Sequence, residues 1–244
     1  MKYVYLLYGI VCYLIFFVSF VYAALFVGNV AIGEFIPKTI DTGEPGPIGM
    51  SILVNVLLLG LFAVQHTIMA RPAFKAWWTK ITPSCTERST FVVLASLILV
   101  LTYWQWRPMP ELIWDIEIPI VRGVLWAIFA SGWGLVLYSS FLIDHFDLFG
   151  LRQVWLNFQG KEYTDKDFKV VSIYKVARNP LMLGFFIAFW ATPTMSQGHL
   201  LWAIVTSVYI ILGTIIEERD LLNLLGPEYA EYRKNTRKFI PIPK

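Results

Sequence analysis

The chain has 244 residues, of which 57% are hydrophobic and only 15% are charged, and its formal net charge is +3. Soluble domains carry roughly 25% charged residues, and a mean hydropathy of +0.60 is too apolar for a surface that faces water. These values exclude a soluble globular protein, and they give no indication of nucleic-acid binding. The two cysteines, Cys12 and Cys85, are too few for a disulfide framework or a cysteine metal site.

Long apolar stretches predict membrane-spanning helices, because about 20 apolar residues cross the hydrocarbon core. The first stretch, residues 3–27, is longer than the apolar part of a signal peptide, so we interpret it as a retained anchor. Similar stretches follow at 48–69, 90–106, 120–143 and 200–216. A shorter one at 181–195 is joined to the last by the turn-forming residues 196–198, which predicts a helical hairpin. The sequence therefore predicts an all-α integral membrane protein with about six transmembrane helices in one domain over residues 1–244.

The basic residues are distributed unevenly between the two sides of the predicted membrane. If the N-terminus is cytoplasmic, only Lys38, Arg107 and Arg122 of the 20 Lys and Arg residues lie in the outer loops. Cytoplasmic loops carry an excess of Lys and Arg. We therefore expect a multi-pass protein with both termini in the cytoplasm.

The segment before the fifth helix combines charge with a helix start. Asn179 is a favourable N-cap and Pro180 a favourable first helical residue, so Arg178 lies just outside the helix, where free N–H groups favour anions. Hairpin legs of nearly equal length then place Arg178 at the same depth as Glu217 and Glu218. Adjacent carboxylates at a helix C-terminus oppose the helix dipole. We therefore expect a positive partner for them, with Arg178 and Arg219 as candidates.

The last part of the chain adds a short helix and a tail. Gly226 ends one predicted helix and Pro227 starts the next. Residues 239–243 then form an apolar, proline-stiffened tail that could cover a pocket.

These motifs resemble the signature of the isoprenylcysteine carboxyl methyltransferase-like superfamily, which is Arg-His-Pro-x-Tyr-x-Gly, Glu-Glu, Gly-x-x-Tyr-x-x-Tyr and an Ile-Pro tail. The matching residues here are Arg178 to Gly184, Glu217-Glu218, Gly226 to Tyr232 and Ile240-Pro241. The resemblance implies that residues 144–244 form the catalytic region, with a cytoplasmic tail, and bind S-adenosylmethionine. Its positive groups would be a third candidate partner for the glutamates. The implied cofactor-binding residues are Tyr174, Arg178, Asn179, Pro180, Met182, Gly184, Glu217, Glu218, Tyr229, Tyr232 and Arg233.

Four further blocks resemble the bacterial methanethiol S-methyltransferases, which make dimethyl sulfide. They are Gln65 to Pro72, Phe74 to Trp78, His145 to Gln153 and Phe189 to Met195. This resemblance implies an enzyme of the bacterial inner membrane that methylates a small thiol and converts methanethiol to dimethyl sulfide. Hydrogen sulfide or a selenium analogue stays open as the physiological thiol. Residues 1–60 would then add an N-terminal anchor and an outer loop.

Methylation of a thiol requires a thiolate, so a general base is expected near the methyl donor. His145 is our first candidate, with Asp144 and Asp147 able to orient it, and His66 is the second. The predicted catalytic residues are therefore His145, Asp147 and His66, and the predicted substrate pocket contains Phe149, Arg152 and Trp190. We expect no metal, and the expected partners are the thiol and the lipid bilayer.

Other functions remain open at this point. Members of the superfamily also methylate prenylcysteine carboxylates or phospholipid amines. The related sterol reductases have more membrane spans than this chain. A non-catalytic membrane factor of the NnrU type is favoured by Asn179 and Met182, which replace the His and Tyr of the superfamily signature.

Overall fold

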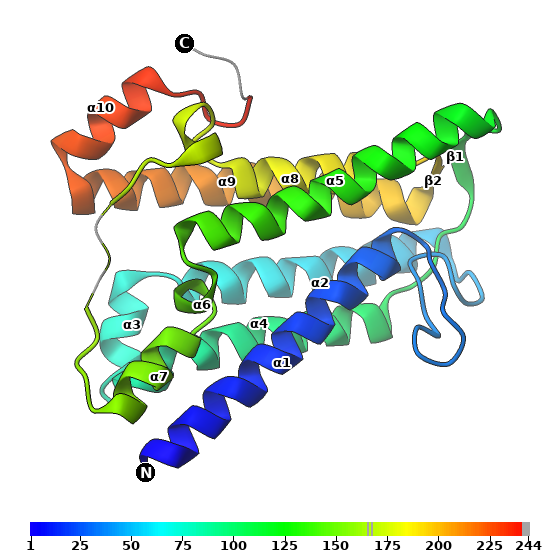
Figure 1. The fold of residues 1–244 in the computed structure, drawn as a ribbon. Helices are drawn as coiled ribbons and strands as arrows, with labels where there is room; N and C mark the ends of the chain where they lie inside the picture. The colour runs from blue at the N-terminus through cyan, green and yellow to red at the C-terminus, as the bar shows by residue number, and fades with distance from the viewer. Residues whose placement is uncertain (165, 167, 241–244) are drawn as a thin grey trace. The chain divides into compact units, whose positions relative to one another are not determined.

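The structure, a computed structural model, describes residues 1–164, 166 and 168–240. Helices dominate it, so the predicted all-α fold is confirmed (Figure 1). The chain divides into two compact units, Met1–Pro110 with Asp144–Asp165 and Glu111–Ile143 with Lys166–Lys244. The predicted single domain stays a prediction, and residues 241–243 of the predicted tail lie outside the described residues.

Five helices in the described part of the chain are long and apolar enough to cross a membrane. They are α1 (Lys2–Val27), α2 (Ile48–Met69), α4 (Glu87–Gln105) with its preceding turn η1 (Ser84–Thr86), α5 (Pro119–Ile143) and α9 (Gln197–Leu225). They coincide with the five longer apolar stretches of the sequence. A multi-pass membrane protein is therefore confirmed.

In the first unit, α1 packs against α4 and α7 (Leu151–Gln159), and α2 packs against α4 and α3 (Pro72–Trp78) (Figure 1). The short helix α6 (His145–Leu148) precedes α7. Gly9 lets α7 approach α1 closely, because a Cβ atom at this position would lie 2.5 Å from a methyl carbon of Val154. The hydroxyl groups of Tyr8 and Thr90, 2.9 Å apart, join α1 to α4. Residues of α1 thus take part in the packing of this unit.

In the second unit, α5 packs against α8 (Pro180–Trp190), and α9 packs against α8 and α10 (Pro227–Asn235). Two glycines allow α5 and α8 to come close. A Cβ atom on Gly184 would lie 2.7 Å from the carbonyl oxygen of Gly132 and 2.9 Å from the backbone nitrogen of Val136. Such close backbone approach at small residues is common between membrane helices.

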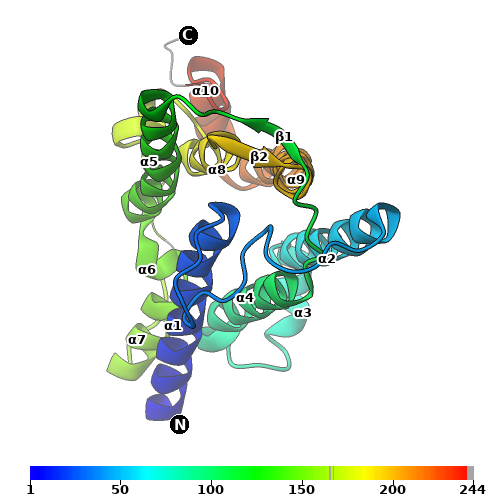
Figure 2. The same cartoon turned by 90° about the vertical axis from the view of Figure 1, so that its right-hand side faces the viewer.

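The predicted helix at 181–195 is shorter than expected, because α8 ends at Trp190. The chain then continues into the strand β2 (Thr194–Ser196), which pairs antiparallel with β1 (Leu112–Asp115) (Figure 2). Pro193 cannot donate a helical hydrogen bond. Instead its carbonyl oxygen accepts from the backbone N–H of Ile116 at 2.9 Å. The backbone of the extended segment is thus satisfied by residues beside β1.

The prediction of two helical legs of nearly equal length is therefore wrong. Helix α8 is only about 17 Å long at 1.5 Å per residue, against a hydrocarbon core of about 30 Å. It lies along the part of α9 from Ser207 to Glu218. At one end Trp190 Nε1 donates to the hydroxyl group of Ser207 at 2.9 Å, and at the other Asn179 donates to Glu218. The extended residues 191–196 run beside the remaining start of α9, where Ser196 caps the helix by accepting from the N–H of His199. Glu217 and Glu218 also lie inside α9, about two turns before its end, and not at its C-terminus.

Candidate functional site

The start of α8 is paired with the C-terminal segment of the chain. Ala177 and Arg237 form a parallel bridge, and the N–H groups of Arg178 and Asn179 donate to the carbonyl oxygens of Arg237 and Lys238 at 2.9 and 3.0 Å. Asn179 occupies the predicted N-cap position, but its side chain makes no capping hydrogen bond. The segment after α10 is thus fixed against the helix start.

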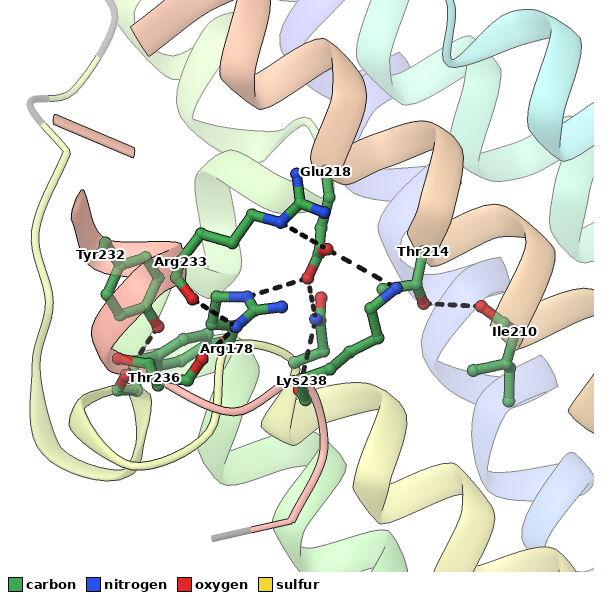
Figure 3. Close-up of polar contacts among 10 residues, drawn as sticks. Arg178, Ile210, Thr214, Glu218, Tyr232, Arg233, Thr236 and Lys238 are labelled. Atoms are coloured by element: carbon green, nitrogen blue, oxygen red, sulfur yellow. Dashed lines mark hydrogen bonds and ion pairs between the residues drawn. The ribbon is translucent and has the colours of Figure 1, made fainter. Parts of the chain in front are cut away.

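Arg178 and Glu218 form a buried ion pair beside this backbone pairing (Figure 3). The Nε of Arg178 donates to Oε1 of Glu218 at 2.9 Å, and the two side chains are only 7% and 4% exposed. The guanidinium group also donates to the carbonyl oxygens of Arg233 at 3.1 Å and of Thr236. The prediction that Arg178 partners the glutamates is confirmed for Glu218.

Glu218 has three further partners, which occupy both of its carboxylate oxygens. Asn179 Nδ2 donates to Oε1 at 3.2 Å, while Lys238 Nζ and Arg233 Nε lie 3.5 and 3.8 Å from Oε2. A buried carboxylate is costly unless it is paired and hydrogen-bonded, and here three cations satisfy that need. We call Arg178, Asn179, Glu218, Arg233 and Lys238 the Glu218 cluster. The side chains of Lys238 and Arg233 are 29% and 50% exposed, so the cluster has an accessible positive edge.

Aromatic rings lie next to the Glu218 cluster. The rings of Tyr229 and Tyr232 are 5.8 Å apart, and Phe168 contacts both at 6.0 and 5.5 Å. The hydroxyl group of Tyr232 donates to the carbonyl oxygen of Tyr174 at 2.6 Å. Burial raises the pKa of Tyr229 and that of Tyr232 to about 12, with the charge of Glu218 adding to the shift. Both phenols are therefore neutral at physiological pH.

The remaining predicted cofactor residues lie around this cluster and along α8. Glu217 is exposed, and its charge adds to the effect of burial, which raises the pKa of Tyr174. Pro180 is buried as the first residue of α8, and Met182, two residues further on, is half-buried. Gly184 lies in the close contact with α5 described above, which gives it a packing role. Roles of these residues in cofactor binding stay predictions.

His145 belongs to the first unit, at the start of α6. It is 2% exposed, and its Nε2 lies 2.9 Å from the hydroxyl group of Tyr13. The rings of Tyr13 and Phe149 lie 5.7 and 4.8 Å from the imidazole. Burial lowers the pKa of His145, which favours the neutral imidazole that a general base requires. Tyr13 could not be predicted from the sequence, because an aromatic residue in an apolar helix carries no signal of a polar role.

Asp147 and Arg152 form a second ion pair near His145. The Nη1 of Arg152 lies 2.9 Å from Oδ1 of Asp147, and the hydroxyl group of Tyr163 donates to Oδ2 at 3.2 Å. Asp144 caps α6 by accepting from the N–H of Asp147 at 3.1 Å. The Asp147 carboxylate thus orders α6 and the segment after α7. Its predicted role in orienting His145 stays a prediction.

An apolar cluster lies between the two candidate histidines. The ring of His66 is 4.8 Å from that of Phe91, which is buried in a cluster against which Phe16 and Phe149 pack. Phe149 stacks on Phe16 at 3.9 Å and contacts His145. His66 and His145 therefore border the same set of packed aromatic side chains.

The structure brings the predicted residues together in two groups. The first unit holds the predicted catalytic residues with Phe149 and Arg152, and the second unit holds the Glu218 cluster and the tyrosines. Trp190 lies at the end of α8 opposite to Arg178, so it does not join the Glu218 cluster. Lys238 was also missed, because the sequence suggested only an apolar tail in this region.

The fold and the site define a multi-pass α-helical membrane protein with a buried, ion-paired helix start. No model of a protein family matches the chain, and no solved structure matches it. Methanethiol S-methyltransferase of Mycobacterium tuberculosis is 50% identical over 242 residues, which cover 99% of this chain and 98% of that protein. Methanethiol S-methyltransferase 1 of Bradyrhizobium diazoefficiens is 48% identical over 240 residues, 98% of this chain and 83% of that protein.

A more distant similarity links the chain to Nurim of Mus musculus, with 27% identity over 182 residues, 70% of this chain and 68% of that protein. The similarity to the bacterial enzymes is high and covers nearly the whole chain. The chain belongs to the methanethiol S-methyltransferase family, and it is a membrane methyltransferase.

Proposed function

We propose that this protein transfers a methyl group from S-adenosylmethionine to a small thiol, with methanethiol as the substrate and dimethyl sulfide as the product. One observation carries the proposal. Relatives named methanethiol S-methyltransferase, from three organisms, are between 45% and 50% identical to this chain over at least 97% of its length.

The second unit fits S-adenosylmethionine by its chemistry. The donor has a carboxylate, an ammonium group, a sulfonium centre and an adenine ring. Arg233 and Lys238 form the accessible positive edge of the Glu218 cluster and would bind the carboxylate. The rings of Phe168, Tyr229 and Tyr232 offer faces for a cation and for adenine. When bound, the donor supplies an electrophilic methyl group on a positively charged sulfur.

Within this proposal Arg178 and Glu218 are positioning residues. Both are almost fully buried, and the Glu218 carboxylate is already occupied by Arg178, Asn179, Lys238 and Arg233. Their ion pair fixes the start of α8 and the segment after α10. The exposed edge of the cluster is thereby held in place for the donor.

His145 is the proposed base for the thiol. Its Nε2 lies 2.9 Å from the hydroxyl group of Tyr13, and burial lowers its pKa, so the neutral imidazole would accept the thiol proton. The aromatic side chains of Phe16, Phe91 and Phe149 would exclude water from a small apolar thiol. A thiolate that loses its hydration shell is a stronger nucleophile.

The distribution of charge supports the proposed location. Only Lys38, Arg107 and Arg122 fall outside the predicted cytoplasmic segments. We therefore infer an enzyme of the bacterial cytoplasmic membrane with both termini in the cytoplasm, on the side where the Glu218 cluster would meet S-adenosylmethionine.

Headspace gas chromatography of proteoliposomes supplied with methanethiol and S-adenosylmethionine tests this function. Wild type should release dimethyl sulfide, Glu218→Gln should release at least about tenfold less, and Glu228→Gln, an exposed acid on α10, should resemble wild type. Parallel reactions with hydrogen sulfide and methaneselenol would rank the acceptors.

Two other results would change the assignment. Binding of S-adenosylmethionine without dimethyl sulfide would direct the search to prenylcysteine carboxylates or phospholipid amines. Absence of binding in well-folded wild type would favour a non-catalytic membrane factor. For the base, His145→Gln should abolish transfer while binding of S-adenosylmethionine is retained.

A further inference from the structure

A cavity of about 450 Å³ lies in the first unit, between the loop 28–47 and the end of α4. This volume is in the range of small-molecule binding sites. Its lining includes Lys38 and Glu44 from the loop, and Trp104, Trp106 and Arg107 from the end of α4 and the residues after it. None of these residues belongs to the site proposed for methyl transfer.

Lys38 is held at the wall of this cavity. Its Nζ donates to the carbonyl oxygens of Trp104 at 2.6 Å and Trp106 at 2.9 Å, so it caps the C-terminal end of α4. An ammonium group has three N–H bonds, and these contacts use two of them. Burial lowers the pKa of Lys38, and the nearby positive charge of Arg107 lowers it further. A bound anion would reduce the repulsion between these two cations at the wall of the cavity.

Arg107 combines a fixed backbone with an available side chain. Its N–H donates to Oδ1 of the fully buried Asn55 at 2.9 Å, and its carbonyl oxygen accepts from Nδ2 of the same residue at 2.8 Å. Its side chain is exposed, as is that of Glu44. Within residues 1–164, 166 and 168–240, neither side chain has an ion-pair partner.

The cavity lies at the ends of three apolar helices. Helix α1 ends at Val27, α4 ends at Gln105 and α2 begins at Ile48, so the loop 28–47 follows one membrane-spanning helix and precedes another (Figure 1). Trp104 is 70% exposed next to this loop, and tryptophan is enriched where the hydrocarbon core meets the headgroups. The phosphate groups of membrane lipids lie at this same boundary.

We propose that this cavity binds the phosphodiester of a phospholipid headgroup. Arg107 and the third N–H of Lys38 bind the phosphate oxygens, and Glu44 binds the ammonium group of an ethanolamine headgroup. The site thereby fixes a lipid against the loop 28–47, apart from the chemistry of methyl transfer.

Native mass spectrometry of the delipidated full chain in detergent tests the proposal. The probes are phosphatidylethanolamine, a diacylglycerol with the same acyl chains, and inorganic phosphate. Wild type should bind phosphatidylethanolamine and not the diacylglycerol. Arg107→Gln should bind phosphatidylethanolamine about tenfold more weakly, the effect of one charge-assisted hydrogen bond. Lys80→Gln removes an exposed positive charge elsewhere in the first unit and should bind like wild type.

Further measurements distinguish a lipid headgroup from free phosphate as the bound group. Glu44→Gln should reduce the preference for phosphatidylethanolamine over phosphatidylglycerol. Equal binding of the lipid by Arg107→Gln and wild type would overturn the proposal. Displacement of the lipid by millimolar inorganic phosphate would also overturn it, because the site would then bind a free anion. Equal binding of the diacylglycerol would overturn it as well, because the contact would then be with acyl chains.

Discussion

Replacing Glu218 by glutamine tests whether the ion pair holds the C-terminal segment against α8. The change keeps an acceptor oxygen for Arg178 and Asn179 but removes the charge that faces Arg178, Lys238 and Arg233. Losing one partner of a buried ion pair costs about 3–5 kcal/mol, and the remaining neutral acceptor reduces this to about 2–3 kcal/mol. Screening by solvent is weak, because Arg178 and Glu218 are only 7% and 4% exposed.

The amide hydrogens of Arg178 and Asn179 report this loss directly, because they donate to the carbonyl oxygens of Arg237 and Lys238. If the segment opens locally, about 2–3 kcal/mol corresponds to roughly 30- to 150-fold faster hydrogen exchange at these two amides. Hydrogen-exchange mass spectrometry on the peptide that covers 177–180 measures it, with Glu228→Gln as the matched control. Unchanged exchange in Glu218→Gln would refute the reasoning, since the segment would then be held by its backbone pairing alone.

Three further predictions concern stability, each measured by thermal unfolding in detergent. Gly184→Ala should cost about 1–3 kcal/mol, because the new Cβ meets the backbone of α5, whereas Gly134→Ala on α5 has open space and should be neutral. Burial lowers the pKa of His145 in the folded protein below the value of about 6.5 that it has in the unfolded chain. Wild type should therefore lose stability as the pH falls from about 6.5 through the folded pKa, because only the unfolded chain takes up the proton readily. His145→Gln should remove that part of the acid loss; an unchanged profile would contradict the cause. Asn55→Leu should cost about 1–3 kcal/mol, since both backbone groups of Arg107 lose their partner.

The five long membrane helices could be predicted from sequence because each contains an apolar run that few other structures can bury. The end of α8 could not be predicted in this way. A short apolar run fits a helix and a strand equally well, so hydropathy continued the helix to residue 195. The available signal was Pro193, which disfavours helical conformation in the residue before it and lacks an N–H. Its partner strand β1 lies far away in the sequence, which a local pattern does not show.

One contact of the candidate site, the ion pair of Arg178 with a glutamate, could be predicted because buried charges need partners of opposite sign. Two adjacent glutamates in an apolar context need positive partners, and this requirement indicated Arg178. It did not distinguish Glu218, which is buried, from Glu217, which is exposed, because that depends on the rotation of α9. Lys238 and Tyr13 could not be found from pattern, since their contacts are set by tertiary packing.

The helix-then-strand arrangement of α8 and β2 affects how the protein enters the membrane. With 11 residues, α8 is too short to insert as an independent segment, which takes about 20 apolar residues. It would insert only as a hairpin with α9, once that longer helix has been synthesised. A reporter domain fused directly after Trp190 would therefore remain on the side of Arg178. A topology map built from such fusions would not report the position of residues 191–196, which in the folded chain run alongside the start of α9.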